Sequence, residues 1–117
     1  MKNILLILLT IFCIGQKTFA YDCAVGGIAY NLNYNTASVT YFSMEYNHGY
    51  YFREVKIPSH ITYDGTTYTV NTIAENAFIN CTKLTSITIP STVTYIHGEA
   101  FAGCSSLSVL TIEDGKQ

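Results

Sequence analysis

The sequence contains no tryptophan, only two prolines and few charged residues, which make up 12% of its 117 residues. So little charge, together with many aromatic residues, excludes a solvated disordered tail. Six Lys and Arg residues are outnumbered by eight Asp and Glu residues, which excludes a nucleic-acid surface built on basic side chains. The length limits the chain to one small domain and excludes a multi-domain enzyme.

The first twenty residues have the pattern of a secretory signal peptide. Lys2 precedes an almost unbroken apolar run over positions 4–14, and Thr18 and Ala20 flank Phe19 in an arrangement similar to A-x-A. The apolar run is too short for a comfortable transmembrane span. We therefore expect cleavage after Ala20 and a secreted or cell-surface product with no membrane span, with an uncleaved membrane anchor as the alternative.

An internal repeat is the strongest pattern in the chain. The segment from Val70 to Leu84 aligns without gaps with the segment from Val93 to Leu107, and the match continues beyond it. The spacing between matched positions is constant and lies within the range of about 20–29 residues typical of leucine-rich repeats. The recurring apolar and cysteine positions, which we expect to be structural, are Ile73, Phe78, Cys81, Leu84, Ile87 and Ile89 in one copy and Ile96, Phe101, Cys104, Leu107, Leu110 and Ile112 in the next.

A third, partial copy lies upstream, where positions 55–59 match positions 87–91. Its spacing from the next copy is wider than the spacing between the other two, which leaves room for an insertion around Asp64 and Gly65. An Asp-Gly pair suits a type I′ hairpin turn, because that turn needs a positive φ at both central residues. We therefore expect a protruding β-hairpin inserted near residues 61–70.

Alternation within each repeat predicts a short strand. In the spacing Leu84-x-x-Ile87-x-Ile89, the two isoleucines point inward and Thr88 points outward, and residues 99–103 read as a short helical turn. One coil cannot bury its apolar side alone, so neighbouring coils must stack into a continuous core. We expect a mainly β fold with short helical turns, in the form of a leucine-rich-repeat solenoid of two to three coils.

Two strand-like segments precede the repeats, at residues 28–34 and 38–42, and residues 35–37 can turn the chain between them. Gly26-Gly27 is interpreted as a turn at the entry to the first strand. These segments predict an N-terminal β-hairpin cap over residues 21–54, followed by the repeats over residues 55–117.

The segment at positions 73–90 resembles the BspA-type leucine-rich-repeat family of bacterial surface and secreted proteins, whose repeats read I-x-x-x-A-F-x-x-C-x-x-L-x-x-I-x-I-P. Positions 103–107 match the same pattern, and the opening around positions 27–32 is similar to the β cap of Bacteroidetes members. The resemblance implies adhesion to host matrix, mucosal or bacterial ligands. Family arrays usually carry more repeats and a C-terminal cap, so we expect a short or truncated member.

An uncapped last coil should expose apolar rungs and strand edges. We therefore expect self-association through the uncapped C-terminal coil. The acidic balance that remains after signal cleavage predicts no nucleic-acid partner and leaves no basic patch to hold an anionic membrane.

The cysteines and histidines do not form a recognisable chemical site. Cys81 and Cys104 are expected to be stacked, reduced thiols, with a disulfide between coils as the alternative. Together with Cys23 they give an odd number of cysteines after signal cleavage. Zinc would need more ligands nearby. The three histidines, which no catalytic motif accompanies, are His48, His60 and His97. We expect no enzyme activity, no metal and no cofactor.

Tyrosine is the residue type that best suits recognition, because it supplies a large contact area with a polar end. Several tyrosines gather just before the repeats, and outward threonines follow the repeat strands. Some of these rings should instead pack into the cap. The candidate ligand-binding residues, for a protein or glycan partner, are Tyr46, Tyr50, Tyr51, Thr85, Thr88 and Thr111. The alternative is a structural spacer or a truncated, non-binding fragment of a longer leucine-rich-repeat protein.

Overall fold

The computed structural model describes residues 21–42 and 53–115, so the predicted signal peptide lies outside the described residues. The described residues contain strands and turns but no helix, and therefore no helix that could cross a membrane. The strands are β1 (Cys23–Val25), β2 (Ile28–Asn33), β3 (Thr36–Thr40), β4 (Arg53–Lys56), β5 (His60–Tyr63), β6 (Thr66–Ile73), β7 (Leu84–Ile89), β8 (Tyr95–Ile96) and β9 (Val109–Ile112).

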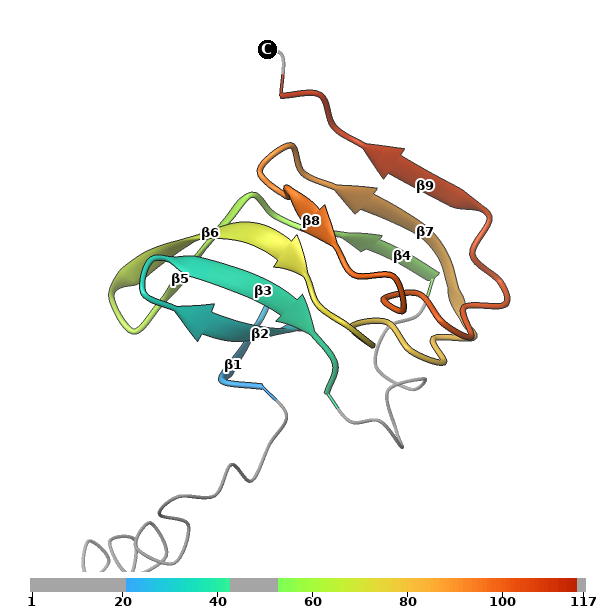
Figure 1. Cartoon of the computed structure of the whole chain (residues 1–117), viewed down its shortest axis with the longest axis horizontal. Coiled ribbons are helices and arrows are strands. Elements are labelled where there is room, and N and C mark those ends of the chain that lie inside the picture. Colours follow the sequence, from blue (N-terminus) through green and yellow to red (C-terminus); the bar gives the residue numbers. More distant parts are fainter. Residues whose placement is uncertain (1–20, 43–52, 116–117) are drawn as a thin grey trace, which may run out of the picture.

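Two parallel ladders define the architecture. One consists of β3, β6 and β8, and the other consists of β4, β7 and β9. The chain alternates between them, so that β3 and β4, β6 and β7, and β8 and β9 each contribute one coil (Figure 1). This confirms the expected solenoid, with three coils among the described residues.

Strand register confirms the alignment of the repeats. Val55 of β4 lies opposite Ile87 of β7, and Ile87 lies opposite Leu110 of β9, which are the pairs matched in the sequence. In the other ladder Ile73 lies opposite Ile96. Residues that match in sequence therefore occupy the same place in successive coils.

The N-terminal cap is an antiparallel extension of the first ladder. β1 pairs with β2 and β2 pairs with β3, and the first of these hairpins turns at Gly26 and Gly27, which both have positive φ. The expected turn at residues 35–37 is wrong in its bounds: the chain turns at Tyr34 and Asn35, and Thr36 already pairs with Asn33. A two-residue turn suits the twist of a hairpin better than a wider one.

The expected hairpin insertion is formed by β5 and β6, with Asp64 and Gly65 at its tip at φ values of 50° and 78°. It is more than a protrusion, because β6 continues to Ile73 and becomes the middle rung of the first ladder. β4, which pairs with β7, spans the boundary that the sequence predicted at 54/55.

An aromatic stack joins the second and third coils. The rings of Phe78 and Phe101 have centroids 5.3 Å apart and planes within 4° of parallel. Beside the stack, the backbone N–H of Phe78 donates to the carbonyl of Ala100 at 2.8 Å. The segment expected to be a short helical turn consists of successive single turns, in which the N–H of Ala100 donates to His97 and that of Cys104 to Phe101.

The residue before each repeat cysteine adopts the left-handed conformation. Asn80 precedes Cys81 at a φ of 57°, and Gly103 precedes Cys104 at a φ of 78°. A Cβ atom on Gly103 would collide with the side chain of Asn80 and lie within 3.2 Å of its backbone. Glycine is therefore required at position 103, both for its conformation and for the close approach of the coils.

Burial falls off at the last coil. Ile87 and Ile89 of β7 are 1% exposed, whereas their counterparts Leu110 and Ile112 of β9 are 46% and 61% exposed. Within the described residues β9 pairs on one side only, with β7. The other structural positions expected in that coil are partly buried against the core; they are Ile96, Phe101, Cys104 and Leu107.

Candidate binding surface

The outer face of the sheet formed by β4, β7 and β9 carries polar and charged side chains in register. On β7 the buried residues Ile87 and Ile89 point into the core, so Thr88 between them points outward. The strand pairing places Thr88 between Lys56 of β4 and Thr111 of β9. A second outward row consists of Glu54, Ser86 and Val109.

Two of the predicted ligand-binding threonines meet on this face. Thr88 and Thr111 are neighbours in the same row, as expected. Thr85 lies at the start of β7, where its hydroxyl donates to the carbonyl of Arg53 at 2.9 Å, so it also holds two coils together. The predicted tyrosines Tyr46, Tyr50 and Tyr51 lie outside the described residues.

Sequence reasoning missed the charged members of this face, Glu54 and Lys56. The signal for them was present, because the alignment that matches Val55 with Ile87 also matches Lys56 with Thr88. The outward position of Lys56 follows from that alignment and from strand alternation. The face is therefore a mixed surface of hydroxyl groups and charges rather than a row of threonines alone.

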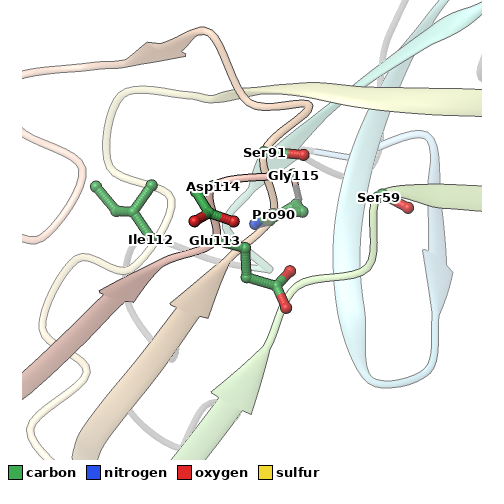
Figure 2. A pocket seen from close by; sticks show the side chains of 7 residues that line it. All are labelled: Ser59, Pro90, Ser91, Ile112, Glu113, Asp114 and Gly115. Atoms are coloured by element: carbon green, nitrogen blue, oxygen red, sulfur yellow. The ribbon is translucent and has the colours of Figure 1, made fainter. Parts of the chain in front are cut away.

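A cavity of about 480 Å³ lies where the three strands end. Figure 2 shows the carboxylates of Glu113 and Asp114 at its centre, with Ile112 at one side and Ser59 at the other. Ser91 and Gly115 approach each other closely, so that a Cβ atom on Gly115 would lie 2.9 Å from the Ser91 hydroxyl oxygen. This end of the sheet is acidic.

A second cavity, of about 840 Å³, lies where the same strands begin. It is basic and rich in hydroxyl groups, and its lining residues are Arg53, Glu54, Thr82, Lys83, Thr85 and Ser106. The described residues that line the two cavities therefore carry opposite net charge. Of the predicted ligand-binding residues that the structure describes, Thr85 alone lines one of these cavities.

The described cysteines are thiols rather than disulfides. The Cys104 thiol donates to the carbonyl of Phe78 at 3.0 Å. A hydrogen bond between Cys81 and Cys104, together with burial, raises the pKa of Cys81, and the same hydrogen bond lowers the pKa of Cys104. Burial and then the neighbouring Asp22 carboxylate raise the pKa of Cys23. Cys23 and Cys81 therefore stay protonated and pack as small apolar groups rather than as nucleophiles.

The described histidines make local contacts. His60 Nδ1 lies 3.0 Å from the hydroxyl oxygen of the adjacent Ser59, and His97 packs edge-on against Tyr95 with ring centroids 6.0 Å apart. His48 lies outside the described residues. Among the described residues, no three His, Cys, Asp or Glu side chains gather in a group that could hold a metal ion.

The stacked coils, the parallel ladders and the constant repeat period define a leucine-rich-repeat solenoid. A comparison with family profiles matches residues 46–117 to the BspA type leucine-rich repeat region, and this match covers well over half of the chain. The protein belongs to the BspA-type leucine-rich-repeat family. A comparison with curated proteins gave no match.

Solved structures agree with this assignment. A leucine-rich repeat protein from Bacteroides ovatus is 34% identical with a TM-score of 0.66, over 77% of this chain and 23% of that one. A leucine-rich cell surface protein from Faecalibacterium prausnitzii is 31% identical with a TM-score of 0.67, over 88% of this chain and 25% of that one. A leucine-rich repeat protein from Bacteroides capillosus is 27% identical with a TM-score of 0.66, over 82% of this chain and 66% of that one.

The chain spans about a quarter of the length of the first two of these relatives. Their shared region therefore covers only part of each longer protein. A cell-surface protein is among the relatives.

Proposed function

We propose that the protein is a secreted or cell-surface binding module that attaches to host matrix, mucosal or bacterial ligands without chemical turnover. The row of Lys56, Thr88 and Thr111 on the outer face of one parallel sheet is the observation that carries this proposal. Hydroxyl groups and a charge, held in register on a rigid sheet, can form several hydrogen bonds with a protein or glycan at little cost in ordering.

Membership of a family with a cell-surface relative supports the same function, as does the signal-peptide pattern of the first twenty residues. Three coils offer a small face, because strands in a sheet are only about 4.8 Å apart. A stable protein interface needs about 800 Å² from each partner. A single copy should therefore bind weakly, and attachment should depend on many copies displayed together, which raises avidity by roughly 10²–10⁴.

The test is capture of mucin glycans, fibronectin and fibrinogen by beads that carry the purified protein at high density. We expect these beads to retain more of the ligands than beads that carry a scrambled chain. The same protein free in solution should bind the ligands much more weakly. Thr88→Glu should reduce capture, because it places a longer, charged side chain in the middle of the outer row. Thr66→Glu is the matched control, since Thr66 is an exposed strand residue of the β5–β6 hairpin.

Equal capture by the two variants would show that the outer face is not the binding surface. Retention at the level of the scrambled chain across the ligand panel would favour the structural spacer instead.

A further inference from the structure

Among the described residues of this acidic protein, the positive charge is gathered on one sheet. The described residues include seven acidic side chains and three basic ones, which are Arg53, Lys56 and Lys83. Arg53 and Lys56 belong to β4, and Lys83 immediately precedes β7. All the Lys and Arg side chains among the described residues therefore lie on or beside the sheet formed by β4, β7 and β9.

Two of these cations share the cavity at the start of that sheet. Arg53 and Lys83 line it together with Glu54 and the hydroxyl groups of Thr82, Thr85 and Ser106. Its volume of about 840 Å³ lies within the range of about 300–1,000 Å³ that is usual for small-ligand sites. Each of the two basic side chains is exposed and can turn toward a bound anion.

The backbone of Arg53 is held in a conformation that favours glycine. Its φ is 67°, in the left-handed region that residues with a side chain seldom adopt. Two hydrogen bonds fix it there: the Arg53 N–H donates to the Lys83 carbonyl at 2.7 Å, and the Arg53 carbonyl accepts from the Thr85 hydroxyl at 2.9 Å. Strain of this kind is found at functional sites, where the side chain is needed in spite of the backbone cost.

The strand pairing is irregular at the same point. Arg53 lies opposite Leu84, whereas the next residue, Glu54, lies opposite Ser86, so Thr85 is the extra residue of a bulge. Bulges redirect side chains and are common beside binding sites. The carbonyl of Thr85 also accepts from the N–H of Ser108 at 3.0 Å, which ties the bulge to the last coil.

We propose that this cavity binds an anionic sugar, through a sulfate ester or a carboxylate held between Arg53 and Lys83. A guanidinium group matches the paired oxygens of sulfate and carboxylate, and an ammonium group adds a second point charge. The surrounding hydroxyl groups suit the hydroxyl groups of a sugar ring. Glu54 lowers the net positive charge of the cavity, which disfavours polyanions such as nucleic acids. This inference rests on the proposed binding function and names its ligand class.

The test is calorimetric titration of the purified protein with three sugars: N-acetylglucosamine 6-sulfate, 3′-sialyllactose and neutral lactose. We expect one or both anionic sugars to bind and lactose not to bind. The first two arms distinguish a sulfate ester from a carboxylate. Binding should weaken as salt is raised, because the contact is ionic.

Arg53→Gly is the decisive variant, because it removes the guanidinium group while suiting the left-handed backbone. We expect it to weaken anionic-sugar binding roughly tenfold or more, since hydrogen bonds between ionised groups are among the strongest in proteins. The melting temperature should stay unchanged or rise. Glu113→Gln, at the opposite cavity, is the matched control and should change the affinity less than twofold.

Three results would overturn the proposal. The first is that lactose binds as well as the anionic sugars, and the second is that Arg53→Gly binds the anionic sugars with full affinity. The third is that an acidic hexapeptide such as hexaglutamate binds whereas none of the sugars does. Capture of ligands by the protein-coated beads would survive each of these results if the outer face binds by itself. Loss of that capture as well would mean that the proposed function has failed.

Discussion

The stacked rings of Phe78 and Phe101 allow the stability of the solenoid to be predicted coil by coil. Phe78 is fully buried, whereas Phe101 is only partly buried in the last coil. Replacing a buried Phe with Ala costs about 3–5 kcal/mol, so Phe78→Ala should remove much of the roughly 5–10 kcal/mol available to a domain of this size. Phe101→Ala should cost less, about 2 kcal/mol, because part of its ring already contacts solvent.

The assay is urea unfolding of each single variant and of the double variant. Because the rings lie 5.3 Å apart and nearly parallel, removing both should cost less than the sum of the single losses, by about 0.5–1.5 kcal/mol. Thr88→Ala, on the outer face, is the control and should change the unfolding free energy by less than about 0.5 kcal/mol. A larger loss from Phe101→Ala than from Phe78→Ala would refute the conclusion that the second coil is more deeply buried than the last one.

The Tyr30 hydroxyl is buried and has no hydrogen-bond partner among the described residues, so Tyr30→Phe should raise the free energy of unfolding by about 1 kcal/mol in urea titration. Gly103→Ala should lower it by about 1–3 kcal/mol in the same assay, because of the positive φ and the close neighbouring coil. In the native protein a thiol reagent should label Cys104 before Cys81, because Cys104 is partly exposed and has a lowered pKa, whereas Cys81 is fully buried. Labelling of both thiols at the same rate would contradict this difference in burial. Self-association through the exposed end of the last coil stays a prediction: Ile112→Lys should lower the average mass in sedimentation equilibrium at high protein concentration.

Much of the fold could be predicted because the repeat is a physical unit. Once Val55, Ile87 and Leu110 are aligned, stacking fixes them as partners in one ladder, and alternation fixes Thr88 and Thr111 on its outer face. Each of these steps needs only local spacing and the requirement that every coil bury its apolar side.

The other features of the fold and of the candidate site depend on contacts that the repeat period does not reveal. β3 pairs with β2 of the cap on one side and with β6 on the other, and both pairings already include Thr36, which the sequence pattern assigned to the turn. The basic cavity brings Arg53 beside Lys83 through a bulge at Thr85. Arg53 lies opposite the apolar residue Leu84 of the next coil. The repeat alignment therefore does not indicate a basic side chain at position 53.

A nuclear magnetic resonance titration can test directly whether the sheet formed by β4, β7 and β9 is the ligand-binding surface. Spectra of the isotope-labelled protein would be recorded as a sialylated and sulfated mucin glycopeptide is added. We predict the largest shift changes at Arg53, Lys83, Thr88 and Thr111, with the glycopeptide recovered chemically unchanged. Shift changes confined to the tip of the β5–β6 hairpin would show that this sheet is not the binding surface, and a cleaved glycopeptide would show that the protein acts as an enzyme.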